Sequence, residues 1–123
     1  MKRVAVVEDN PDNRLLVEAI LEDDFELELF ENGADAVAGI PPFAPDVILL
    51  DISLPGMDGK EVLRRLRAKP QTAAIPVIAF TAHAMHGDRE DLLALGFNGY
   101  VSKPVVDEDI LIDAIRGQLP GSD

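Results

Sequence analysis

The sequence predicts an α/β fold in which a five-stranded parallel sheet is covered by helices on both faces. Short β-branched apolar runs alternate with amphipathic segments along the whole chain, and this alternation is typical of parallel sheets with right-handed crossovers. The runs at residues 4–7 and 47–50 contain no polar side chain, as expected of strands that are buried on both faces.

The expected elements follow one another as strand and helix, five times over. We expect strands at residues 4–7, 27–30, 47–50, 77–80 and 100–101, and helices at residues 11–22, 34–40, 60–68, 85–95 and 107–119. Asn10 is a suitable N-cap for a helix whose first residue is Pro11. The flavodoxin-like (βα)5 strand order 2-1-3-4-5 is the arrangement that we predict, and in it the strand order reverses between strands 1 and 3.

Apolar residues of the first expected helix do not all lie on one face. We expect Leu16, Ala19 and Ile20 to face the sheet, which leaves Leu15 on the outer side of the helix.

Length and composition indicate one domain, which we expect at residues 1–119, followed by a short tail at residues 120–123. The 47% hydrophobic content of the 123 residues is sufficient for a buried core. The formal net charge of -12 makes nucleic acid and anionic membrane surfaces unfavourable partners. There is no cysteine, and no apolar stretch approaches the roughly 20 residues that a membrane-spanning helix needs. A cytoplasmic location is the expectation.

Polar side chains follow the expected strands at the point where each strand ends. Glu8 and Asp9 follow the first strand, Asp51 follows the third, Thr81 the fourth and Lys103 the fifth. In an open α/β sheet, ligands bind outside the carboxyl ends of the strands where the strand order reverses. Each residue taken alone is compatible with a helix cap or a strand end, so their expected convergence carries the inference.

Three carboxylates without a nearby cysteine or histidine form a hard oxygen site. Such a site suits Mg²⁺, Mn²⁺ or Ca²⁺ better than Zn²⁺, and we select Mg²⁺ because it commonly combines one or two carboxylates with waters and phosphate oxygens. A carboxylate beside this cation can attack phosphorus, which makes Asp51 the candidate phosphoacceptor. Lys103 would supply a second positive charge, and Thr81 a hydroxyl donor to a phosphoryl oxygen.

These residues resemble the receiver domain of bacterial two-component response regulators, from residue 4 to about residue 119. The resemblance rests on four pieces in the order and approximate spacing of that family: Val-Val-Glu8-Asp9-Asn10, Leu-Leu-Asp51-Ile-Ser-Leu-Pro55-Gly-Met-Asp-Gly59, Phe-Thr81-Ala82 and Tyr100-Val-Ser-Lys103-Pro104. The runs at residues 8–13 and 81–85 are most similar to those of hybrid-kinase receivers and of stand-alone single-domain regulators, and a stand-alone regulator is the expectation.

The resemblance implies that Asp51 receives a phosphoryl group from the phosphohistidine of a histidine kinase or a histidine phosphotransfer protein. It implies that Asp9, Asp51 and the backbone carbonyl of Ser53 bind Mg²⁺, with Glu8 acting through water.

The resemblance also implies how the phosphoryl group is held and how the signal leaves. Thr81 and the amide of Ala82 would take phosphoryl oxygens, and Lys103 would pair with the phosphate. Tyr100 matches the switch aromatic of the family. Output would be protein contact on the face formed by helix 4, strand 5 and helix 5, without turnover of a separate substrate.

Three other functions remain open from the residues alone. A Mg²⁺-dependent phosphatase of the haloacid dehalogenase type carries a second aspartate two residues after its nucleophile, where this chain has Ser53. An FMN-binding flavodoxin relative would meet repulsion between its phosphate and Glu8-Asp9. The third alternative is a receiver-shaped interaction module that is not phosphorylated.

Overall fold

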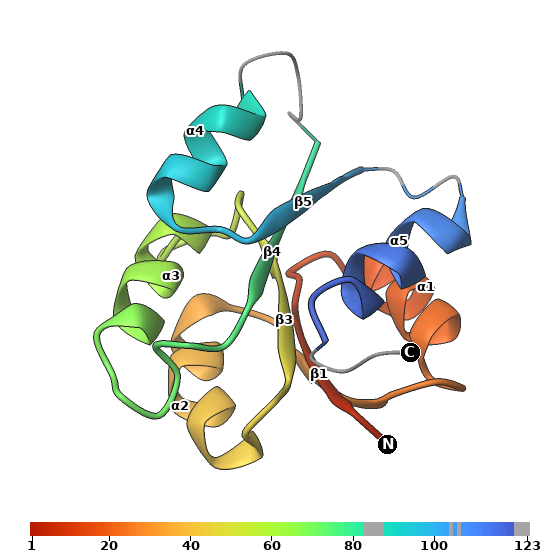
Figure 1. Cartoon of the computed structure of the whole chain (residues 1–123), viewed down its shortest axis with the longest axis horizontal. Coiled ribbons are helices and arrows are strands. Elements are labelled where there is room, and N and C mark those ends of the chain that lie inside the picture. Colours follow the sequence, from red (N-terminus) through yellow and green to blue (C-terminus); the bar gives the residue numbers. More distant parts are fainter. Residues whose placement is uncertain (83–87, 104, 106, 120–123) are drawn as a thin grey trace.

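The computed structural model describes residues 1–82, 88–103, 105 and 107–119. In this part of the chain, five strands and five helices alternate, and all strand pairs are parallel (Figure 1). The strands are β1 (Arg3–Val7), β2 (Glu26–Phe30), β3 (Val47–Asp51), β4 (Val77–Thr81) and β5 (Gly99–Ser102). The helices are α1 (Pro11–Leu21), α2 (Gly33–Phe43), α3 (Gly59–Arg67), α4 (Asp88–Leu95) and α5 (Glu108–Arg116). The strand order is β2-β1-β3-β4-β5, so the predicted fold and topology are confirmed.

Three sequence predictions fall on residues outside the described ones. They are the start of the fourth helix at residue 85, the proline at 104 and the tail at residues 120–123. Among the described helices, none combines the length and the apolar character that crossing a membrane requires.

The sheet separates two hydrophobic clusters, and β1 shows why. Ala5 and Val7 belong to one cluster, and Val4 and Val6 belong to the other. Helices α2, α3 and α4 cover one face of the sheet, and α1 and α5 cover the opposite face (Figure 1). Successive side chains of a strand point to opposite faces, so a continuous apolar run supplies both clusters at once. The polar ligands of a site must therefore lie beyond the strand ends.

The helix α1 buries Ile20 and exposes Leu15 as expected, but the rest of its buried face differs from the expectation. Val17, Ile20 and Leu21 are the buried residues of this helix, whereas Leu16 is exposed together with Leu15. The spacing i, i+3, i+4 of the buried residues is that of one helix face. Ala19, expected to face the sheet, is also exposed.

The helix α2 extends beyond its expected end at residue 40, through Pro41 and Pro42 to Phe43. Proline has a φ angle compatible with a helix, but Pro41 and Pro42 have no N–H to donate to the carbonyl groups four residues earlier. The chain then turns at Ala44, which has a left-handed φ of 53° and donates its N–H to the Ile40 carbonyl at 3.0 Å.

Helix caps position the segments that follow β1 and β3. The side-chain oxygen of Asn10 accepts hydrogen bonds from the N–H groups of Asp12 at 2.9 Å and Asn13 at 3.1 Å, which confirms the predicted cap of α1. Asp58 caps α3 in the same way, through the N–H of Glu61 at 2.9 Å. Both caps fix where a strand-end loop stops and a helix begins.

Candidate functional site

The register of the central strands brings the acids together. Val7 of β1 pairs with Leu50 of β3, so the residues that follow them, Glu8 and Asp51, stand at adjacent strand ends. One carboxylate oxygen from each of Glu8, Asp9 and Asp51 lies within 4.8 Å of the others. We call these three residues the acidic pocket. The structure thus shows the convergence that the sequence predicted.

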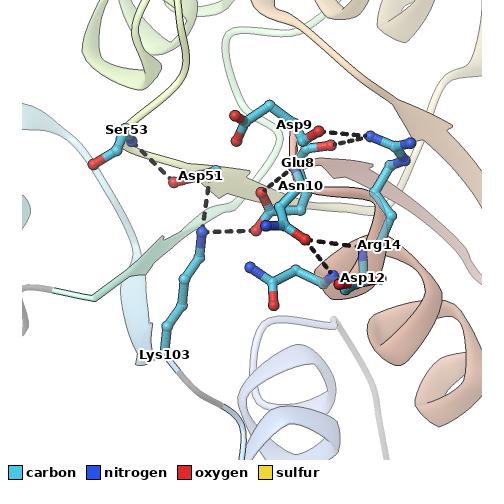
Figure 2. A network of polar contacts seen from close by, with 9 residues as sticks. Glu8, Asp9, Asn10, Asp12, Arg14, Asp51, Ser53 and Lys103 are labelled. Atoms are coloured by element: carbon cyan, nitrogen blue, oxygen red, sulfur yellow. Dashed lines mark hydrogen bonds and ion pairs between the residues drawn. The ribbon is translucent and has the colours of Figure 1, made fainter.

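The ammonium group of Lys103 joins the acidic pocket from the end of β5 (Figure 2). Its Nζ lies 2.7 Å from Oε1 of Glu8 and 2.9 Å from Oδ2 of Asp51. The Lys103 N–H donates to the Thr81 carbonyl at 2.8 Å, and the ammonium stands 4.9 Å from the centre of the Phe80 ring. Main chain and side chain therefore both fix this cation between two carboxylates.

The carboxylate of Asp51 is buried and remains ionised. Burial alone would raise its pKa, but hydrogen bonds from Lys103 and from the Ser53 N–H outweigh burial, and the pKa lies below its ordinary value. The Ser53 N–H donates to Oδ1 at 2.9 Å, and the Lys103 ammonium donates to Oδ2 at 2.9 Å. An ionised carboxylate held on both oxygens is an oriented nucleophile.

Glu8 is the most enclosed of the three acids. Its side chain is fully buried, and burial raises its pKa in spite of the Lys103 ammonium and the N–H of Asn10, which both favour the charged form. The Asn10 N–H donates to Oε2 of Glu8 at 3.0 Å, so both oxygens of Glu8 have protein partners. Glu8 and Asp51 together raise the pKa of Lys103, because the two carboxylates outweigh the effect of burial on the ammonium.

The donor set fits a hard divalent cation. Three carboxylates face one ammonium, and oxygen ligands with this excess of negative charge suit Mg²⁺. Asp9 is exposed and is the acid with the most open approach.

The loop after β3 approaches the acidic pocket because of Gly59. A Cβ atom at residue 59 would lie 2.4 Å from the carbonyl oxygen of Asp51 and 2.8 Å from the Cα of Ile52, which is closer than real Cβ contacts. The Gly59 N–H donates to the Ile52 carbonyl at 3.0 Å. Glycine therefore lets α3 start directly against the strand end that carries Asp51, with Ser53 exposed in the loop between them.

The remaining predicted site residues come from β4, from β5 and from the residue that follows β4. Thr81 is buried and follows Phe80, the register partner of Asp51, whereas Ala82 is exposed beside it. Tyr100 pairs with Ala79 in the sheet and packs, partly buried, against the cluster under α2, α3 and α4.

Sequence reasoning missed Arg14, whose guanidinium contacts the main chain of the acidic pocket. Nη1 donates to the carbonyl oxygens of Glu8 and Asp9, both at 3.0 Å. One signal was present, because a base in the first turn of a helix opposes the helix dipole and so indicates a specific partner.

Comparison with known proteins agrees with this geometry. The family model described as "Response regulator receiver domain" matches residues 4–116. The signal transduction histidine-protein kinase BarA of Escherichia coli K12 is 40% identical over 120 residues, which are 97% of this chain and 13% of BarA. Protein PilH of Pseudomonas aeruginosa is 37% identical over 122 residues, which are 98% of this chain and 100% of PilH.

Among solved structures, the chain is similar to the receiver domain of the sensor histidine kinase PA1611 from Pseudomonas aeruginosa PAO1. The two are 35% identical with a TM-score of 0.86, and the match covers 95% of this chain and 96% of the other. That structure has a magnesium ion coordinated in its active site cleft. The chain spans a small part of BarA and the full length of PilH. It is thus similar both to a segment of a much longer histidine kinase and to a protein of its own length. The chain belongs to the family of response regulator receiver domains, the signalling modules of two-component systems.

Proposed function

We propose that Asp51 accepts a phosphoryl group from the phosphohistidine of a histidine kinase or a histidine phosphotransfer protein. The observation that carries the proposal is the state of this carboxylate. It is buried, its pKa is lowered, and its two oxygens are held by the Ser53 N–H and the Lys103 ammonium. Donors that are already fixed beside the oxygens of a transferring phosphoryl group lower the barrier to transfer, because they need no reorganisation.

The transfer has a simple balance of bonds. A carboxylate oxygen of Asp51 attacks phosphorus, and the P–N bond of phosphohistidine breaks with its electron pair moving to the imidazole. Lys103 stands where it can pair with the transferred group, since its ammonium already contacts Oδ2 of Asp51. The hydroxyl of Thr81, at the end of β4, and the amide of Ala82, which follows it, would bind other phosphoryl oxygens.

Asp9 and Asp51 would hold Mg²⁺ directly, together with the carbonyl of Ser53, and Glu8 would act through water. When bound, Mg²⁺ would neutralise charge on the transferring phosphoryl oxygens. The three converging carboxylates and the magnesium in the cleft of the PA1611 receiver support this assignment.

The output that we propose is phosphorylation-dependent contact with a protein, and not turnover of a separate substrate. The contact face comprises α4, β5 and α5, and Tyr100 on β5 acts as the switch. The Lys103 N–H and the Thr81 carbonyl are bonded at 2.8 Å, so a change at the phosphoryl group can reach β5 directly. The charge of -12 favours a protein partner over nucleic acid or an anionic membrane.

The test is labelling by acetyl phosphate, followed by mass spectrometry of the intact protein. The wild type with Mg²⁺ is expected to gain one phosphoryl group, and EDTA, Asp51→Asn or Asp9→Ala should reduce labelling strongly. Asp23→Asn is the matched control, because Asp23 is an exposed acid between α1 and β2. Equal labelling of Asp51→Asn and the wild type would contradict the proposal.

The output face has its own test, which is a pull-down with and without beryllofluoride. Partners that are retained only after beryllofluoride treatment should be lost in variants of α4 or α5 that still become labelled. If such variants retain these partners as the wild type does, the output surface lies elsewhere on the protein.

A further inference from the structure

Arg14 lies in the first turn of α1, and none of the roles above uses it. Its side chain is 17% exposed, so the guanidinium is largely removed from water. Nη1 donates to the carbonyl oxygens of Glu8 and Asp9, both at 3.0 Å (Figure 2). Nη2 lies 3.2 Å from Oε1 of Glu31, whose side chain is 70% exposed.

The carbonyl groups are the principal partners of this cation. The pair with Glu31 is open to solvent on one side, and ion pairs of that kind contribute little to stability. Placing a positive charge in the first turn of a helix is also unfavourable with respect to the helix dipole. A largely buried guanidinium at this position therefore needs the charge-assisted hydrogen bonds to Glu8 and Asp9.

The two carbonyl groups belong to the peptide units on either side of Asp9. Each peptide unit is planar, so its carbonyl oxygen reports the orientation of the whole plane. The φ angle of Asp9 relates its side chain to the first plane, and the ψ angle relates it to the second. A guanidinium that fixes both planes therefore fixes the direction of the Cα–Cβ bond of Asp9, from which its carboxylate extends.

The second of these peptide units is held at both of its ends. Its carbonyl oxygen, that of Asp9, accepts from Arg14, and its N–H, that of Asn10, donates to Oε2 of Glu8 at 3.0 Å. Bonds in such a chain polarise one another. The same carboxylate of Glu8 contacts the Lys103 ammonium at 2.7 Å, so the ordering extends across the acidic pocket.

We propose that Arg14 is a positioning residue of the acidic pocket, which presets the Asp9 carboxylate for the divalent cation by holding the two peptide groups that flank it. The inference rests on the proposed function, because it takes Asp9 to be a ligand of that cation. It adds a residue that contacts neither the metal nor the phosphoryl group.

The test is isothermal titration of the folded protein with Mg²⁺. Arg14→Met is expected to raise the dissociation constant by about tenfold, as is typical for loss of a group that orients a metal ligand. Arg14→Lys keeps one cationic donor and should recover part of the loss. Glu31→Gln, which leaves the bonds to the carbonyl groups in place, and the control Arg64→Met on the exposed face of α3 should keep the wild-type constant.

Urea unfolding of the same variants without Mg²⁺ separates positioning from general stabilisation. A merely structural residue would lower the free energy of unfolding while leaving the dissociation constant of the folded protein unchanged. That outcome for Arg14→Met would overturn the proposal. If Arg14→Met does not fold, Arg14→Lys decides, and a wild-type constant for it would overturn the proposal equally.

Asp9→Asn distinguishes failure of this inference from failure of the proposed function. Weaker Mg²⁺ binding by Asp9→Asn, combined with unchanged binding by Arg14→Met, would contradict only the role proposed for Arg14. Unchanged binding by both variants removes the metal site itself, and with it the inference.

Discussion

Removing the ammonium group of Lys103 is expected to destabilise the fold at neutral pH. Its Nζ lies 2.7 Å from Glu8 and 2.9 Å from Asp51, whose side chains are 0% and 2% exposed. Loss of one partner from a buried ion pair costs about 3–5 kcal/mol. Lys103 is itself 15% exposed, so water reaches part of the gap, and a methionine retains most of the packing of the stem. For Lys103→Met we expect the lower end of that range, about 3 kcal/mol.

The cost should shrink in acid, and the sign follows from Glu8. Its pKa already lies above the ordinary value of 4.5 because of burial, and loss of the ammonium raises that pKa further. The folded state holds the Glu8 proton at pH values where the unfolded chain has already released it. Stability is therefore lost as the pH rises from the pKa of Glu8 in the unfolded chain to its pKa in the folded state. The penalty of Lys103→Met is therefore smaller at about pH 5.5 than at about pH 7.5.

The assay is urea unfolding followed by far-ultraviolet circular dichroism in EDTA, since the chain has no tryptophan and a single tyrosine. Lys60→Met is the control, because Lys60 is exposed and a surface substitution changes stability by only about 0.5 kcal/mol. A penalty for Lys103→Met below about 1 kcal/mol would refute the assumption that the pair is effectively buried. A penalty that is equal at both pH values would refute the role of Glu8.

Substitutions at three further positions test the local geometry. Gly59→Ala places a Cβ 2.4 Å from the Asp51 carbonyl oxygen, and we expect a loss of about 1–3 kcal/mol in urea unfolding. Acetyl phosphate should label this variant more slowly, whereas wild-type stability and labelling would show that the loop accommodates the methyl group. Ala44→Gly relieves a φ of 53° and should raise the free energy of unfolding by about 0.5 kcal/mol, so a lower midpoint in urea would contradict it. Asn10→Ala removes both cap hydrogen bonds of α1 at a cost of about 1 kcal/mol, while Asn10→Asp should unfold close to the wild type.

The topology and the acidic pocket were predictable because both follow from strand ends. Parallel strands end at the same edge of the sheet, so residues that directly follow Val7 and Leu50 must meet once those two pair. Lys103 was predictable for the same reason, since it follows β5. No detail of side-chain packing was needed for either inference.

Other features were not predictable because their signals are weak or ambiguous. Leu16 has the same hydrophobicity as the buried Leu21, and only the position of the sheet decides which of the two is covered. Prolines usually mark a helix end, yet α2 continues through Pro41 to Phe43. The contact of Arg14 was missed because its acceptors are carbonyl groups, which every residue has and which leave no pattern in a sequence.

Glu8 and Asp51 have different roles although both contact the Lys103 ammonium. Three carboxylates against one ammonium leave an excess of negative charge, which a divalent cation would balance before a phosphoryl group adds about -1.5 to -2 charges. On the proposed chemistry, phosphorylation consumes a carboxylate oxygen of Asp51, so this acid cannot be the permanent partner of the ammonium. Glu8 can be, because it is fully buried, contacts Lys103 at 2.7 Å and is fastened by the Asn10 N–H. The buried glutamate thus keeps the cation at the strand end while the aspartate changes its chemical state.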